Sequence, residues 1–236
     1  MKRKRRSEDV LGVTVDEEKT VREGETVTLH TGFTGLQSDV QIQWFHGSVG
    51  PDTIIAQSQV VRGEIITDYS DRFRDRLQLD RQTGSLTIRN ISTTDSGVYR
   101  VQIISGKLSE KTFSVTVYAT VPAPHIRVKL QSRQTAAVSG SSGPKCSVEC
   151  SVENGRDVTL SWYKGKEILN QTSSPDLSTT LSLPLKIEDQ DNNIYSCVAA
   201  NPVSQQTARL KKELCPHSPE EALEQEFVLF PESVGM

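Results

Sequence analysis

The stretch Asp95-Ser96-Gly97-Val98-Tyr99-Arg100-Val101 decides the fold of this 236-residue chain. Its first three residues favour turns, because Asp and Ser side chains bond nearby backbone and Gly accepts a positive φ. From Tyr99 onward, large apolar residues occupy every second position through Val101 and Ile103. A period of two is typical of a β-strand with one buried face. The stretch therefore predicts a turn that leads into a half-buried strand, with Tyr99 in the core.

The same period continues through most of the first half of the chain. Val40, Ile42 and Trp44 share one face of an upstream run, which places Trp44 in the core. Helical periodicity is nearly absent, and clusters of Gly, Asp and Ser separate the runs. This pattern predicts an antiparallel β-sandwich over residues 13–119. Comparable short runs cover residues 25–30, 77–79, 86–88 and 113–117.

A second, smaller series of short runs follows a stiff connector at residues 120–124, where two prolines favour extended backbone. This series covers residues 125–215 and predicts a second sandwich. Residues 1–12 are expected to form a basic N-terminal segment and residues 216–236 an acidic tail, both disordered. The expected fold class is therefore all-β, with two tandem sandwiches between two disordered ends.

Composition and motifs exclude several classes of function. The formal net charge of −3 and the isoelectric point of about 5.9 provide no basic field for nucleic acid. The sequence lacks nucleophile elbows, phosphate loops, dinucleotide fingerprints and zinc-peptidase motifs. We therefore expect no enzyme activity, no cofactor, no metal and no small-molecule substrate.

No apolar run reaches the roughly 18 residues of a membrane span, and the basic block at residues 2–6 lacks the apolar core of a signal peptide. We expect both a signal peptide and a membrane anchor to be absent from this chain.

All the cysteines lie in the second half of the chain: Cys146, Cys150, Cys197 and Cys215. Their even number and the lack of metal-ligand spacing favour two disulfides over a zinc site or reduced thiols. Disulfides indicate an oxidising compartment. Two Asn-x-Ser/Thr sequons, at Asn90 and Asn170, are the acceptor sites of N-glycans. Together these features favour an N-glycosylated extracellular protein.

The stretch from Asp95 to Val101 resembles the Asp-x-Gly-x-Tyr-x-Cys signature of immunoglobulin domains, with Val101 in place of the cysteine. In that fold the tyrosine hydroxyl bonds upstream backbone and fixes the corner before the strand. Thr31 stands where the partner cysteine would be. The resemblance implies a variable-type domain over residues 13–119 that lacks the inter-sheet disulfide. It also implies an ion pair between Arg72, the arginine of an Arg-Phe pair, and Asp95.

The second series resembles a short constant-type immunoglobulin domain over residues 125–215. Tyr195-Ser196-Cys197 matches the end of the same signature, and Trp162 follows Cys150 as the core tryptophan of such domains does. The resemblance therefore implies an inter-sheet disulfide between Cys150 and Cys197, packed on Trp162, with Tyr195 also in the core.

The remaining two cysteines are then expected to pair with each other. Four cysteines allow three pairings. A bond between Cys146 and Cys150 is disfavoured, because four strand residues span about 13 Å whereas bonded cysteines have Cα atoms within ~7 Å. The pairing that the resemblance implies is nested, with Cys146–Cys215 outside Cys150–Cys197.

The order of these features resembles the SLAM family of lymphocyte surface receptors, and segments such as residues 24–31 and 71–88 look like fish members of that family. The family combines a variable-type domain without its disulfide and a short constant-type domain with two. The resemblance implies a cell-surface or secreted glycoprotein of immune recognition and adhesion. Its partner would be the same or a related immunoglobulin-domain receptor on another cell, bound through the front sheet of the first domain.

The period of two also predicts which side chains the front sheet presents to such a partner. A polar face with one aromatic suits a weak, reversible protein contact, in which Phe45 is the anchor. His46 and residues 52–57 are expected to border this face. The alternative is an ordinary solvated sheet face, which antiparallel sheets often have. The expected partner-binding residues are Gln41, Gln43, Phe45, Arg100, Gln102 and Thr112.

Two other functions fit the same sequence. The chain would serve as a soluble decoy or ligand-binding immunoglobulin protein without signalling if it acts without an anchor. A remote alternative is an intracellular, non-enzymatic interaction protein, which the basic block at residues 2–6 would suit. Free thiols at every cysteine would favour this second alternative, because disulfides do not persist in a reducing compartment.

Overall fold

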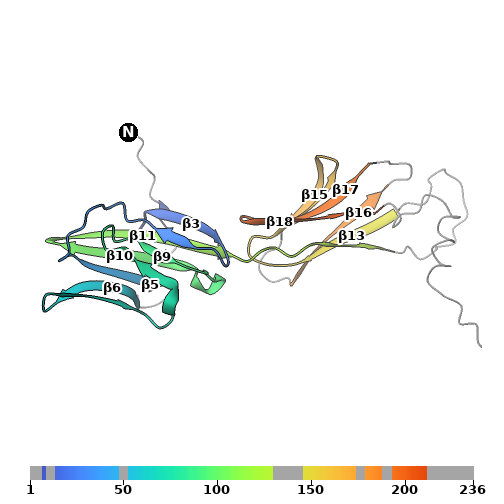
Figure 1. Ribbon diagram of the computed structural model, residues 1–236. Coiled ribbons are helices and arrows are strands. Elements are labelled where there is room, and N and C mark those ends of the chain that lie inside the picture. The colour runs from blue at the N-terminus through green and yellow to red at the C-terminus, as the bar shows by residue number, and fades with distance from the viewer. Residues whose placement is uncertain are drawn as a thin grey trace, which may run out of the picture. The chain divides into compact units, whose positions relative to one another are not determined.

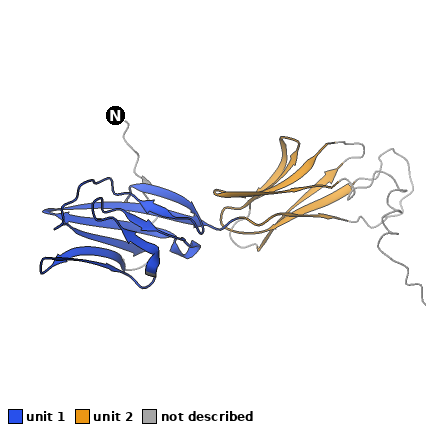
Figure 2. Ribbon diagram, viewed as in Figure 1, with its two compact units in different colours: residues 1–120 blue, residues 121–236 orange. Residues whose placement is uncertain are grey.

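The computed structural model describes residues 7–8, 14–47, 53–129, 146–173, 179–187 and 193–211. The chain divides into two compact units, residues 1–120 and 121–236 (Figure 2). Both units consist of β-strands arranged as sandwiches, so the prediction of an all-β fold with two tandem immunoglobulin-like domains is confirmed. Within the described residues, no helix has the length and apolar character that a bilayer crossing needs.

The expected terminal segments contribute little to the described structure. Residues 216–236 and most of residues 1–12 lie outside the described part of the chain. The described part of the N-terminal segment, β1 (Ser7–Glu8), pairs antiparallel with β2 (Thr14–Val15) of unit 1.

The front sheet of unit 1 has six strands. β3 runs parallel to β11, and the other neighbours are antiparallel. The long strands β10 and β11 lie side by side through the middle of the sheet (Figure 1). Across the sheet the order is β3 (Glu17–Arg22), β11 (Lys107–Tyr118), β10 (Gly97–Ser105), β5 (Gln41–Gly47), β6 (Thr53–Val61) and β7 (Glu64–Tyr69).

The back sheet of unit 1 closes the core against the front sheet. Its strands, in order, are β4 (Val27–Leu29), β9 (Leu86–Ile88) and β8 (Leu77–Leu79). Trp44 from β5 is fully buried, and its indole nitrogen donates to the carbonyl oxygen of Gly84 at 2.9 Å. The Trp44 and Phe113 rings pack with centroids 5.6 Å apart. Packing around this indole replaces the inter-sheet disulfide, because no cysteine lies in unit 1.

A short 3₁₀ turn, η2 (Thr93–Asp95), sets up the entry of β10. The Ser92 hydroxyl accepts from the turn, and the Asp95 carboxylate accepts from the Ser92 backbone at 2.9 Å, which together form a capping box. The buried Tyr99 hydroxyl donates to the Asp95 carbonyl oxygen at 2.6 Å. This bond fixes the corner that the sequence signature implies.

The ion pair of this corner differs from the expected one. Asp95 pairs with Arg76, through bonds of 2.6 and 3.2 Å, and not with Arg72. Arg72 instead donates to the Thr94 carbonyl oxygen at 3.0 Å. The reason is the 3₁₀ turn η1 (Arg74–Arg76), which follows the buried Phe73 and carries Arg76 to the carboxylate.

The described residues of unit 2 form a sandwich of seven strands. One sheet has the order β12 (His125–Val128), β13 (Cys146–Glu153) and β16 (Thr180–Ile187). The second sheet has the order β15 (Glu167–Ser173), β14 (Thr159–Lys164), β17 (Tyr195–Asn201) and β18 (Ser204–Arg209). Trp162 and Tyr195 are buried between the sheets.

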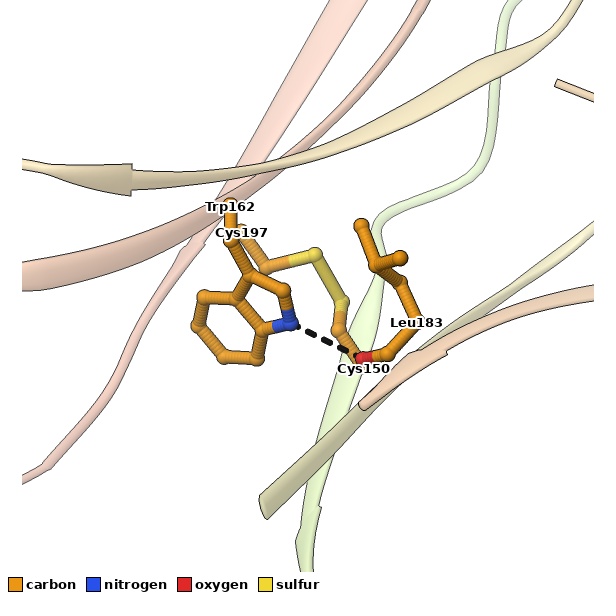
Figure 3. The surroundings of a disulfide bond; sticks show 4 residues. All are labelled: Cys150, Trp162, Leu183 and Cys197. Carbon is orange, nitrogen blue, oxygen red and sulfur yellow. Dashed lines mark hydrogen bonds between the residues drawn. A yellow bond between two sulfur atoms is a disulfide. The ribbon is translucent and has the colours of Figure 1, made fainter. Parts of the chain in front are cut away.

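A disulfide between Cys150 and Cys197 joins the two sheets of unit 2, with Cα atoms 6.4 Å apart. Figure 3 shows the Trp162 indole beside this bond, donating to the Leu183 carbonyl oxygen at 2.9 Å. Cys146 is also disulfide-bonded. Its expected partner, Cys215, lies outside the described residues.

Candidate functional site

The outward face of the front sheet in unit 1 brings together five of the six expected partner-binding residues as accessible side chains. Cross-strand pairing places Phe45 opposite Arg100, and Gln43 opposite Gln102. Gln41 lies at the end of the same strand, opposite Ile104. All five are partly exposed or lie beside exposed residues, because strand alternation sends their neighbours Ile42, Trp44 and Val101 into the core.

The centre of this face is a cation–aromatic pair. The Arg100 guanidinium carbon lies 5.1 Å from the centroid of the Phe45 ring. Stacking on the ring holds the long arginine side chain in one place, so less conformational entropy is lost when a partner binds. Aromatic residues and arginine are enriched in protein–protein interfaces, and arginine is among the residues that most often dominate affinity.

Apolar side chains extend the face beyond the expected residues. Ile54 pairs with Phe45, and Ile66 pairs with Gln59 on the same face of the β6–β7 hairpin. Ile104 pairs with Leu108, which is 58% exposed. We call the combined surface the recognition face: Gln41, Gln43, Phe45, Ile54, Ile66, Arg100, Gln102, Ile104 and Leu108.

A row of amide side chains crosses the sheet through Gln102, Gln43 and Gln57, and a carboxylate lies at each end of it. Glu110 accepts from the Gln102 amide at 2.5 Å, and Asp68 accepts from the Gln57 amide at 3.4 Å. The face therefore combines apolar area with amide groups, acidic edges and a cation at its centre. This mixture can select a partner by charge while apolar contacts contribute affinity.

Thr112 does not fit the expected role. Its position opposite Arg100 is on the correct face, but the residue is only 7% exposed. The backbone of Asp16, in the chain segment between β2 and β3, donates to the Thr112 carbonyl oxygen, and the Asp16 carboxylate accepts from the Thr112 backbone, both at 3.0 Å. Asp16 therefore lies against Thr112 and limits its contact with a partner.

His46 was expected to border the face and instead lies in the core, at 4% exposure. It pairs with Tyr99, an inward residue of β10. The alternation that sends Trp44 inward and Phe45 outward sends His46 inward again, so the signal was present in the sequence. Residues 48–52, which adjoin this end of β5, lie outside the described residues.

The two sequons occupy accessible positions. Asn90 follows β9 of the back sheet of unit 1, is exposed and has a φ of 46°. Asn170 is an exposed residue of β15, the edge strand of its sheet in unit 2. Among the residues that the structure describes, no group of three or more His, Cys, Asp and Glu side chains could hold a metal ion.

Comparison with known proteins identifies the class of both units. Residues 14–120 match the immunoglobulin V-set domain family, and residues 127–212 match the immunoglobulin domain family. The chain belongs to the immunoglobulin superfamily. The order of the two matches, a V-set domain and then an immunoglobulin domain, is the order of the two compact units.

Similar proteins include adhesion and lymphocyte surface molecules. The mouse (Mus musculus) hepatic and glial cell adhesion molecule is 30% identical over 189 residues, which cover 77% of this chain and 43% of that protein. The human (Homo sapiens) T-lymphocyte surface antigen Ly-9, a SLAM-family member, is 26% identical over 68% of this chain and 23% of that protein. The chain therefore spans less than half the length of either relative.

A solved structure supports the fold alone. The crystal structure of the CD2-binding domain of CD58 superposes with a TM-score of 0.56 at 22% sequence identity, covering 85% of this chain and 98% of that one. Among the relatives with similar sequences, the SLAM family is represented at low identity, alongside adhesion molecules of other groups.

Proposed function

We propose that this chain is the recognition part of an extracellular adhesion or immune receptor. It binds the same or a related immunoglobulin-domain protein on another cell through the recognition face. The observation that carries this proposal is the Phe45–Arg100 pair, held at the centre of a face with several exposed apolar side chains. Ordinary solvated faces of soluble domains seldom gather such groups, because exposed apolar patches promote association.

The similar proteins support the class of partner. Both an adhesion molecule and a lymphocyte surface antigen cover most of this chain. The SLAM-like resemblance of the sequence points to partners of the same superfamily. Contacts of this kind are weak and reversible. Their amide and charged groups lose hydrogen bonds to water when they bind the partner, so the net gain in binding free energy is small.

Surface plasmon resonance with the immobilised chain tests the proposal. The analytes are the chain itself and the extracellular parts of Ly-9 and of the hepatic and glial cell adhesion molecule. We expect saturable, rapidly dissociating binding of at least one analyte. Phe45→Ala and Arg100→Glu should each weaken that binding by about tenfold or more, the effect of losing a hot-spot residue.

Arg89→Glu is the matched control for Arg100→Glu. Arg89 is exposed beyond β9 of the back sheet, and its guanidinium donates to Gln78 at 2.6 Å. Arg89→Glu makes the same change of charge on the opposite sheet of unit 1, so binding should persist. Absence of binding to every analyte, or equal binding by Phe45→Ala and Arg100→Glu, would contradict the proposal.

N-glycans at Asn90 and Asn170 are part of the proposed extracellular state. A glycan at Asn90 would extend from the back sheet and leave the recognition face open. Peptide mapping of protein from secreting cells, after enzymatic deglycosylation in ¹⁸O-labelled water, should convert both asparagines to ¹⁸O-labelled aspartate. Unmodified asparagine at both positions, together with free thiols, would favour an intracellular protein instead.

A further inference from the structure

His46 lies at the end of β5 in a closed aromatic pocket. Its ring centroid is 4.5 Å from that of Tyr99 and 5.7 Å from that of Phe73. A Cβ atom on Gly97 would lie 2.9 Å from His46 Nε2, so the glycine is what allows the ring to fit there. The residue is 4% exposed, and water has little access to it.

The hydrogen bonding of the ring defines its charge state. Nδ1 lies 3.4 Å from the Arg72 guanidinium. Because arginine only donates, Nδ1 accepts, and the proton of a neutral ring is on Nε2. Nε2 has no hydrogen-bond partner of normal geometry among the described residues, but the backbone carbonyl oxygens of Asp95 and Ser96 lie close enough to the ring to favour its protonated form. A second proton would go onto Nδ1, where it would displace the Arg72 contact and place two positive charges side by side in a buried site.

The charged and titratable groups that act on His46 come from the turn before η1, from η2 and from β10. Burial and the Arg72 charge lower the pKa of His46 below 6.5. The Asp95 carboxylate and the backbone carbonyl oxygens of Asp95 and Ser96, in and after η2, act in the opposite direction. Tyr99 on β10 stays neutral, because burial raises the pKa of its phenol well above the usual value.

We propose that His46 is an acid-sensitive switch in unit 1. At neutral pH the neutral ring accepts from Arg72 and joins β5 to the corner formed by η2. When the ring is protonated, the pocket opens, and the end of β5 loosens together with the η2 corner. Phe45 and Arg100 lie one residue away from His46 and Tyr99 in sequence, so acid would also disturb the centre of the recognition face.

The sign of the effect follows from proton linkage. The unfolded chain binds a proton at a pH near 6.5, the ordinary value for histidine, whereas folded unit 1 resists it. The contribution of His46 to stability is therefore complete above pH 6.5. It decreases as the pH falls below 6.5, which is the range of acidified endosomes.

Two measurements on the full chain test the switch. Two-dimensional NMR titration of the histidine ring signals, assigned with His46→Gln, should give a His46 midpoint below 6.5. Thermal and urea unfolding of unit 1 should be measured at pH 7.5 and 5.5 in the wild-type chain and in His46→Gln. The ratio of the wild-type unfolding constant to that of His46→Gln should be about tenfold larger at pH 5.5 than at pH 7.5. His30→Gln, which changes an exposed histidine of the same unit, should keep the full pH dependence.

Arg72→Gln provides a second variant that leaves the ring in place. Without the neighbouring charge, the His46 midpoint should move upward and the pH dependence of unfolding should shrink. A His46 midpoint at or above 6.5 would overturn the proposal. So would an identical loss of stability between pH 7.5 and 5.5 in the wild-type chain and in His46→Gln. If His46→Gln does not fold, replacing His30, His125 and His217 in turn by Gln assigns the remaining ring signal to His46, and its titration midpoint decides alone.

Discussion

Asp95 joins three parts of unit 1 at the scale of single residues. Its carboxylate accepts from both Arg76 and the Ser92 backbone, and its carbonyl oxygen accepts from Tyr99. Burial alone would raise the pKa of Asp95, but the bonds from Arg76 and Ser92 and the nearby Arg72 charge lower it below its ordinary value. The ionised carboxylate is thus the stable form, and it holds the corner before β10.

Arg76 and Arg72 should differ sharply when each is replaced by alanine. Arg76→Ala leaves a buried carboxylate without its cation and should destabilise unit 1 by about 3 kcal/mol. Arg72→Ala removes the bond to the Thr94 carbonyl oxygen at the surface and should cost about 1 kcal/mol. Urea unfolding of the two variants measures this difference. A larger loss in Arg72→Ala would restore the Arg72–Asp95 pair that the sequence resemblance implied.

Glu17 predicts a separate loss of stability in acid. Hydrogen bonds from Lys111 and Lys19 lower the pKa of Glu17 from 4.5 to about 2. A folded pKa below the unfolded one stabilises unit 1 above pH 4.5, and this contribution is lost as the pH falls toward 2. Glu17→Gln should therefore flatten the unfolding curve against pH in that range. An unchanged slope would show that the two lysine contacts contribute nothing in solution.

The β6–β7 hairpin contributes exposed apolar residues at the scale of secondary-structure elements. A register shift between Trp44 and Phe45 in the β5–β6 pairing places Ile54 opposite Phe45 and adds it to the recognition face. Ile66 on β7 extends the same face. The hairpin therefore enlarges a surface that β5 and β10 alone would leave mostly polar.

Ile66→Lys separates binding from stability on this hairpin. Ile66 is 38% exposed, so its replacement should change the free energy of unfolding by no more than about 0.5 kcal/mol. In the proposed recognition face the same change buries a charge against the partner and should weaken binding severalfold. Calorimetry and surface plasmon resonance on the same preparation measure both. Unchanged binding would remove β7 from the recognition face.

Strand alternation accounts for what the sequence predicts well and for what it misses. The period of two identifies Trp44 and Tyr99 as core residues without any knowledge of the fold. It would also have placed His46 inside, had it been followed one step further. Alternation carries no information on the 3₁₀ turn that brings Arg76 to Asp95. Nor does it reveal the bulge beside Phe45, since both depend on how distant segments pack.

The two units use different means of stabilisation at the scale of the whole molecule. Unit 1 relies on packing around Trp44 and on the Asp95 corner, whereas unit 2 has a covalent bond between its sheets. All the cysteines lie in unit 2. A reductant should therefore act on one unit and spare the other.

Reduction or a Cys150→Ala/Cys197→Ala double variant tests this division. Closing a loop of 47 residues lowers the free energy of folding by about 4 kcal/mol in the chain-entropy view. In the double variant, unit 2 should lose about that much stability, while amide exchange in unit 1 stays unchanged. Reduction also breaks the disulfide of Cys146, so the loss in unit 2 should then be larger. Parallel loss of protection in both units would show that they unfold as one body.

The recognition face is tested most directly by hydrogen–deuterium exchange of the full chain, alone and saturated with the analyte that binds in the surface plasmon resonance panel. The expected result is new protection in residues 41–47 and 100–104, with the back-sheet segments 27–29 and 86–88 unchanged. Protection confined to the back sheet, or to unit 2, would contradict the role of the Phe45–Arg100 face.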